Sequence, residues 1–82
     1  MMKRETYRIE DIYVPVKRRA TLVPATVDEI AASILEVGQQ SPILVRQDGA
    51  RLVLVEGLHR LEACKALGET TIAGYLVQAR KF

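Results

Sequence analysis

Two short apolar runs on either side of an Asp-Gly pair constrain the fold of this chain more than any other feature. The runs are residues 42–46 and 51–55, and Asp48 and Gly49 lie in the four residues between them. An Asp-Gly pair favours the tight turn of a β-hairpin. Both runs are continuous in hydrophobicity and do not alternate, which is typical of strands that are buried on both faces. The pattern therefore predicts a hairpin that is covered by helices.

A first helix is predicted between the N-terminal segment and this hairpin. Residues 26–29, Thr-Val-Asp-Glu, have the form of a capping box, with Pro24 two residues before it. Gly38 follows as the expected stop. Apolar residues at helical spacing predict one inward face. This face consists of Val27, Ile30, Ala31, Ile34 and Leu35.

A second helix is predicted after the hairpin, from about Gly57 to Leu67, with Gly68 as its stop. The helical period places Leu61, Cys64 and Leu67 on its inward face.

Strands are predicted at both ends of the chain. Apolar residues alternate from Tyr7 to Val16 with a phase slip near Asp11, which indicates a bulge or a break between two short strands. Residues 17–21 form a basic connector, and residues 70–77 supply the last strand. The order strand, helix, hairpin, helix, strand predicts an α/β (α+β) fold with a small mixed sheet and packed helices.

Composition limits the class of protein. The 82 residues are 49% hydrophobic and 27% charged, which is typical of one small globular domain spanning 1–82. A net charge of +2 neither requires nor excludes nucleic acid. The single cysteine, Cys64, allows no internal disulfide, so we expect a reduced thiol in the core and a cytoplasmic protein. No apolar stretch approaches 18 residues, so no membrane partner is expected.

A glycine, a histidine and an arginine begin the second predicted helix. His59 and Arg60 would place two potential cations where the helix N-terminus already carries a partial positive charge. A phosphate bound there would remove this conflict, and Gly57 would let the backbone approach it closely. The alternative is that both side chains point to solvent and pair with Glu56 or Glu62.

Other polar residues are candidates for the same pocket. The loop before the hairpin and one serine of the first helix supply Gly38, Gln39, Gln40, Ser41 and Ser33. The alternative for this loop is an ordinary helix stop. Two acids, Glu29 and Glu56, are candidate general bases or magnesium ligands, although Glu29 also serves the capping box.

The basic connector is a candidate contact for DNA. It contains Lys17, Arg18 and Arg19 in succession, and the alternative is a solvated surface. One histidine and one cysteine five residues apart do not have the spacing of a zinc site.

From about residue 9 to residue 78 the chain resembles the ParB/sulfiredoxin superfamily. Residues 57–63, Gly-Leu-His-Arg-Leu-Glu-Ala, are similar to the Gly-x-Arg-Arg-x-x-Ala box of ParB N-terminal domains and to the Gly-Cys-His-Arg box of sulfiredoxins. Residues 30–34, Ile-Ala-Ala-Ser-Ile, are followed by Gly38 and by residues 42–46. This order resembles the ParB helix Leu-Ala-x-Ser-Ile and its Gly-x-x-Gln-Pro-Ile loop.

The resemblance implies a pocket for a nucleoside triphosphate, ATP or CTP, with Mg²⁺. It implies that His59 and Arg60 hold phosphates, that Gly57 permits close approach, and that Ser33 lines the same pocket. Members of the superfamily phosphorylate a sulfinic acid with ATP, bind and hydrolyse CTP to form a DNA clamp, phosphorylate free serine, or act as nucleases.

This chain departs from the family motifs at several positions, and these departures reduce the number of activities that the resemblance supports. Leu58 stands at the sulfiredoxin cysteine, which argues against sulfinic acid reduction. Ser41 occupies the position of the glutamine in the ParB loop, and His59 occupies the position of the first arginine in the ParB box. The sequence therefore does not predict selectivity for a cytidine nucleotide. The DNA-reading helix-turn-helix and the dimerisation tail of a full ParB are not found.

Three hypotheses follow. The first is a stand-alone ParB-like domain that binds a nucleoside triphosphate in a DNA- or plasmid-linked regulatory or partition role, as a homodimer or with a partner protein. The second is a small nuclease or phosphotransferase with Glu29 or Glu56 as base. The third is a non-catalytic interaction module that binds DNA through its basic residues.

Overall fold

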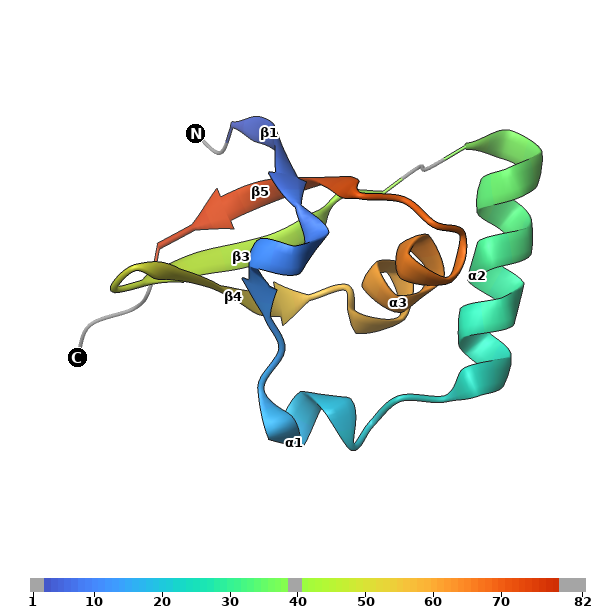
Figure 1. Cartoon of the computed structure of the whole chain (residues 1–82), viewed down its shortest axis with the longest axis horizontal. Helices are drawn as coiled ribbons and strands as arrows, with labels where there is room; N and C mark the ends of the chain where they lie inside the picture. Colours follow the sequence, from blue (N-terminus) through green and yellow to red (C-terminus); the bar gives the residue numbers. More distant parts are fainter. Residues whose placement is uncertain (1–2, 39–40, 79–82) are drawn as a thin grey trace.

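A mixed five-stranded sheet and three α-helices make up the part of the chain that the computed structural model describes, residues 3–38 and 41–78 (Figure 1). Along the chain the elements are β1 (Arg4–Arg8), the 3₁₀ turn η1 (Ile9–Asp11), β2 (Ile12–Tyr13), α1 (Val16–Arg19), α2 (Pro24–Val37), β3 (Ile43–Asp48), β4 (Arg51–Glu56), α3 (Leu58–Ala66) and β5 (Thr71–Val77). The strand order is β1-β5-β3-β4-β2. The predicted α/β class with a small mixed sheet is confirmed.

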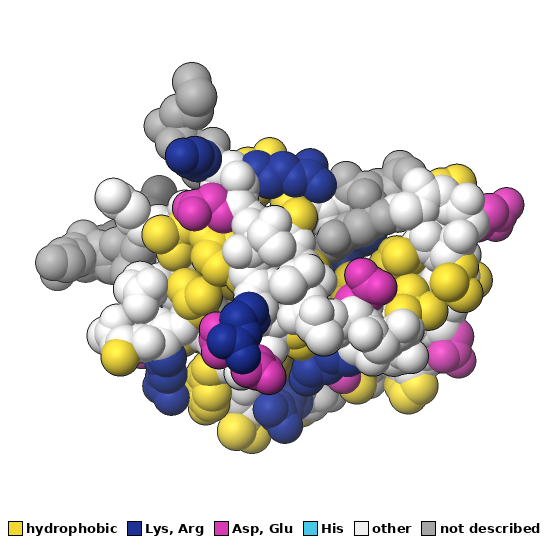
Figure 2. Space-filling view, turned by 45° about the horizontal axis from the view of Figure 1, so that its top comes forward, with side chains coloured by type: hydrophobic (Ala, Val, Ile, Leu, Met, Phe, Trp, Pro, Cys, Tyr) yellow, Lys and Arg dark blue, Asp and Glu magenta, His cyan; other side chains and the backbone are white. Residues whose placement is uncertain are grey.

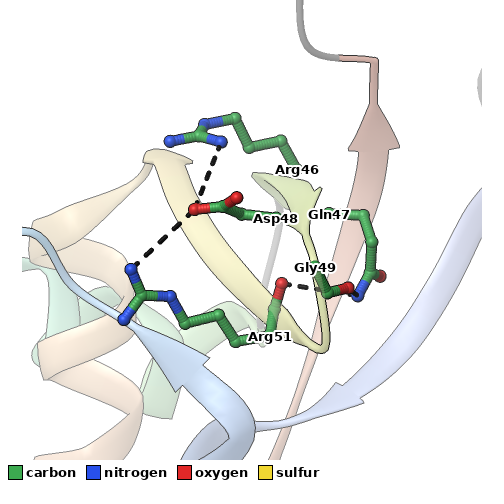
Figure 3. Close-up of polar contacts among 5 residues, drawn as sticks. All are labelled: Arg46, Gln47, Asp48, Gly49 and Arg51. Carbon is green, nitrogen blue, oxygen red and sulfur yellow. Dashed lines mark hydrogen bonds and ion pairs between the residues drawn. The ribbon is translucent and has the colours of Figure 1, made fainter.

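The predicted hairpin is the centre of this sheet. Strand β3 pairs with β4 antiparallel and with β5 parallel. Gly49 turns the chain with a φ of +60°, a value that L side chains rarely adopt. Oδ2 of Asp48 lies 4.0 Å from Nη1 of Arg46 and 3.8 Å from Nη2 of Arg51 (Figure 3). Gln47 Nε2 donates a hydrogen bond of 2.8 Å to the Gly49 carbonyl oxygen.

The two edge strands of the sheet are almost adjacent in sequence, because η1, with three residues, is all that separates β1 from β2. In a flat sheet, strands four positions apart would lie about 19 Å from one another. The four residue steps from Arg8 to Ile12 reach about 14 Å at most. The sheet therefore curls, and η1 links its edges (Figure 1). The interruption predicted near Asp11 is confirmed as this 3₁₀ turn.

The core lies between the curled sheet, η1 and α3. Leu61 and Cys64 are 0% and 2% exposed, which confirms their predicted inward positions, whereas Leu67 is half-buried at the helix end. The principal buried cluster consists of Ile9, Ile12, Val14, Ile43, Val45, Leu54, Leu58, Leu61, Cys64 and Ile72. Helix α3 is thus the helix that closes the core.

Helix α2 confirms the predicted inward apolar face only in part. In Figure 1 it stands at the right, packed against α3, and none of its residues is buried. Ile34 touches the edge of the core, but Leu35 is 76% exposed. Hydrophobic side chains show over α2 at the right of Figure 2. Val27, Ile30, Ala31 and Ile34 are half-buried, in agreement with the predicted inward face, and the prediction was wrong for Leu35.

The predicted capping box is also wrong. Helix α2 begins at Pro24, with Val23 as its N-cap and no side-chain capping bond. Proline is favoured at the first helical position because its φ suits the helix and its missing N–H is not needed there. Thr26 and Glu29 consequently lie inside the helix. The predicted stop is confirmed, since Gly38 has a φ of +83° and donates a hydrogen bond of 2.8 Å to the Ile34 carbonyl.

The predicted first strand is too long, and the basic connector is partly helical. Strand pairing ends at Tyr13, and residues Val16–Arg19 form α1. Pro15 precedes this turn as its N-cap. A proline cannot donate to a strand ladder, so it ends the strand where the helical turn begins.

Candidate functional site

A cavity of about 330 Å³ lies at the start of α3. Its wall contains residues from α1 and the connector after it, from α2, from the end of β4 and from the first turn of α3. These lining residues are Arg18, Thr21, Ile30, Glu56, Gly57, Leu58, His59 and Arg60. The cavity thus brings together four residues that the sequence assigned to a phosphate or catalytic site, Glu56, Gly57, His59 and Arg60.

The charge on this cavity is mainly positive. Arg18 and Arg60 are both half-buried, and neither forms an ion pair within residues 3–38 and 41–78. Glu56 is the carboxylate on the wall. Glu62 was the other suggested partner of Arg60, but its Oε2 lies 3.3 Å from Nζ of Lys65. A guanidinium group forms its strongest hydrogen bonds with carboxylates and phosphates. Unpaired guanidinium groups in a cavity therefore suit a phosphate ligand.

Gly57 connects β4 to α3 and sets the position of the cavity wall. Its φ is +107°, and a Cβ on this residue would lie 2.6 Å from Cγ2 of Ile43. Backbone conformation and packing therefore both require glycine here. The Leu61 N–H donates to the Gly57 carbonyl at 2.9 Å, and no side chain caps the helix. The N–H groups of the first turn, which have no acceptor within the helix, belong to residues of the cavity wall.

His59 makes a long-range contact that the sequence did not predict. Its Nε2 accepts a hydrogen bond of 3.0 Å from the backbone N–H of Val23. An imidazole nitrogen can accept only when it carries no proton, so the proton of this ring is on Nδ1. The positive charge on the cavity wall is carried by Arg18 and Arg60.

Several candidate residues lie away from the cavity. Glu29, Ser33, Gly38 and Ser41 are exposed and are not part of its wall, while Gln39 and Gln40 are outside the described residues. The capping role of Glu29 is excluded by the start of α2 at Pro24. Their proposed contacts with a nucleotide remain predictions.

The basic run is divided between different surfaces. Arg18 lines the cavity, Lys17 is exposed, and Arg19 lines a separate cleft of about 180 Å³. Sequence reasoning missed Arg18 and Thr21 as cavity residues because it treated the run as a connector. Arg18 and Thr21 are three residues apart, and residues at this spacing lie on one side of a helical turn. A helical turn predicted at this position would have placed both side chains on the same side. Thr21 Oγ1 donates a hydrogen bond of 2.7 Å to the Arg18 carbonyl.

Cys64 has the surroundings of a structural thiol. It is 2% exposed. Burial raises the pKa of its thiol, the positive charge of Arg60 lowers it in part, and Glu69 raises it further. A thiol held protonated in a core is a poor nucleophile. The predicted packing role of Cys64 is consistent with both observations.

No group of three or more histidine, cysteine, aspartate or glutamate side chains in residues 3–38 and 41–78 could hold a metal ion. In the same part of the chain, every helix is too short or too polar to span a bilayer.

Comparison with known proteins identifies the family. The family model of the ParB N-terminal domain matches residues 4–81. The chain belongs to the ParB N-terminal domain family. A probable chromosome-partitioning protein ParB of Campylobacter jejuni is 36% identical to this ParB N-terminal domain over 62 residues, which are 76% of this chain and 22% of that protein. The domain therefore spans about a fifth of this relative.

Solved structures show the same fold. Sulfiredoxin from Arabidopsis thaliana superimposes with a TM-score of 0.83 and 28% identity, covering 94% of this ParB N-terminal domain and 86% of sulfiredoxin. The C-terminally truncated chromosome-partitioning protein ParB from Caulobacter crescentus, complexed with CTP-γ-S, superimposes with a TM-score of 0.81 and 24% identity. The match covers 96% of this chain and 46% of that protein chain. The predicted ParB/sulfiredoxin-like fold is confirmed.

Proposed function

We propose that this ParB N-terminal domain binds a nucleoside triphosphate, ATP or CTP, with its phosphates in the cavity at the start of α3. The observation that carries the proposal is the pair of half-buried arginines, Arg18 and Arg60, that line one cavity without an ion-pair partner in the described residues. The similar ParB structure from Caulobacter crescentus, which is complexed with CTP-γ-S, supports a nucleotide as the ligand.

Each element around the cavity has a part in this binding. Arg60 and the first-turn N–H groups of α3 contact phosphate oxygens from one side, and Arg18 reaches them from α1. Mg²⁺ fits this site because it prefers carboxylate and phosphate oxygens and keeps several waters, and Glu56 is the carboxylate on the wall. Bound Mg²⁺ would neutralise part of the triphosphate charge.

Replacing Arg60 or Arg18 by alanine is expected to weaken nucleotide binding about 10- to 100-fold, because hydrogen bonds to charged groups contribute about 1.5–3 kcal/mol each. Isothermal titration with ATP, CTP and GTP in the presence of Mg²⁺ measures this loss. Arg19→Ala is the matched control, because it removes the same group from the same helix outside the cavity. Equal binding by wild type and Arg60→Ala would refute the proposed site.

Product assays separate binding from catalysis. A nuclease or phosphotransferase is the alternative function, favoured by the position of Glu56 on the cavity wall beside Arg60. Nucleoside diphosphate or nicked plasmid DNA that forms with wild type but not with Glu56→Gln would support a catalytic role for Glu56, as general base or as Mg²⁺ ligand. Glu29 does not line the cavity, so Glu29→Gln is the control.

We further propose a DNA-linked regulatory or partition role, exercised as a homodimer or with a partner protein. Lys17 and Arg19, exposed on α1, are the residues proposed to contact DNA phosphates. Two such contacts predict that log K for duplex DNA falls with log salt concentration with a slope of about −1.8. Fluorescence anisotropy of a labelled duplex gives this slope. Lys17→Ala is expected to reduce it by about 0.9, and an unchanged slope would exclude this contact.

A further inference from the structure

The histidine of this chain joins two helices through a backbone hydrogen bond. His59 lies in the first turn of α3, and Val23 is the N-cap of α2, 36 residues earlier. Val23 donates its N–H to His59 Nε2 at 3.0 Å. The contact needs a neutral ring, because both nitrogens of an imidazolium carry protons and neither can accept. Protonation of His59 and this hydrogen bond therefore exclude one another.

The hydrogen bond holds one wall of the cavity in place. Val23 ends the connector that follows α1, and Arg18 and Thr21 from α1 and this connector line the cavity opposite α3. Helix α2, which begins after Val23, has no buried residue. Elements with few buried contacts open at a low cost in free energy. The exposed Val23–His59 hydrogen bond adds to the packing of α2 against α3 and ties the start of α2 to the first turn of α3.

Charged groups from three elements share the cavity with His59. The ionisable groups that share the cavity with it are Arg18 from α1, Glu56 from the end of β4 and Arg60 from α3, while α2 contributes only the apolar Ile30. Two guanidinium groups and one carboxylate give the cavity a net positive charge. A triphosphate in the cavity reverses the sign of this balance, and a nearby opposite charge favours the protonated ring.

We propose that His59 is a positioning residue that couples nucleotide binding to the start of α2. Without nucleotide, the neutral ring holds the Val23 N–H. When a triphosphate binds, the ring takes up one proton from solvent at Nε2, the Val23 hydrogen bond breaks, and the connector is released. The inference rests on the proposed nucleotide binding, but it makes a separate prediction about protons.

Wild type is expected to take up a positive number of protons per nucleotide, because a bound anion favours the charged form of the ring. Titrations with Mg-ATP and Mg-CTP in two buffers of different ionisation enthalpy measure this number. Linkage then requires affinity to rise as pH falls, by up to tenfold per pH unit. His59→Gln is the matched control, because a glutamine oxygen can accept from Val23 but does not titrate.

Nitrogen NMR of the ring gives an independent reading, which is unambiguous because the chain has 1 histidine. The free protein should show the Nδ1–H tautomer, and saturation with nucleotide should give the imidazolium. The proposal is overturned if nucleotide binds with the same proton uptake by wild type and His59→Gln, or if the ring stays neutral. Absence of any nucleotide binding would instead refute the proposed function, and this inference with it.

Discussion

Gly57→Ala is expected to destabilise the domain by about 2–5 kcal/mol. An L side chain at positive φ costs roughly 1–2 kcal/mol, and overpacking a core costs about 1–3 kcal/mol more. Both costs apply here, because the φ of Gly57 is +107° and the new Cβ would lie 2.6 Å from Ile43 Cγ2. Urea unfolding followed by circular dichroism measures the loss of free energy.

Gly68→Ala is the matched control for this experiment. Gly68 also has a positive φ, of +80°, but nothing lies within 4 Å of its added Cβ. Only the conformational cost should then remain. If Gly57→Ala proves too unstable to study, Gly57→Ala with Ile43→Leu should recover part of the loss, because leucine has no methyl at the Cγ2 position. Equal costs for Gly57→Ala and Gly68→Ala would contradict the packing at Ile43.

Leu61→Ala is expected to cost about 3–5 kcal/mol of unfolding free energy, because deleting a fully buried leucine loses its transfer free energy and leaves a cavity. Leu61 on α3 is 0% exposed. Leu35→Ala on α2 makes the same chemical change at a side chain that is 76% exposed, and should cost less than about 0.5 kcal/mol. Thermal or urea unfolding of both variants provides the comparison. A large cost for Leu35→Ala would mean that the outer side of α2 is covered in solution.

This pair of leucines shows how far the sequence could predict the fold. The period of 3.6 residues correctly placed Leu61 inward, and it placed Leu35 inward by the same rule. Periodicity identifies the apolar side of a helix but not what that side meets. Helix α3 lies on the sheet and buries Leu61 and Cys64, whereas α2 packs mainly against α3 and has no buried residue. The difference is decided by tertiary packing, which no local pattern encodes.

Competing local signals explain the error at the start of α2. Thr26 with Glu29 and Pro24 are both valid start signals, and the structure follows the proline. The hairpin was predicted correctly, because Asp48-Gly49 indicates a turn and no neighbouring residues indicate a different structure there.

The candidate site was predictable to the extent that it is local. Glu56, Gly57, His59 and Arg60 are adjacent in sequence, so one strand-to-helix junction brings them to one cavity. The sequence did not distinguish Arg18 from its basic neighbours. The helical turn of α1 places Arg18 on the cavity wall and its neighbours on other surfaces. The partner of His59 is a backbone N–H, which has no sequence signature at all.

The pairing of the first strand with the last has a consequence for synthesis of the chain. Strand β1 bonds to β5, so residues near both ends of the described fold meet in the sheet. During translation the β3–β4 hairpin and α3 leave the ribosome before β5 does. Until then β1 has no neighbour, and its backbone groups remain open to any other exposed strand. Pairing between such distant segments also slows folding. Strand β1 is therefore the segment most dependent on the arrival of residues 71–77.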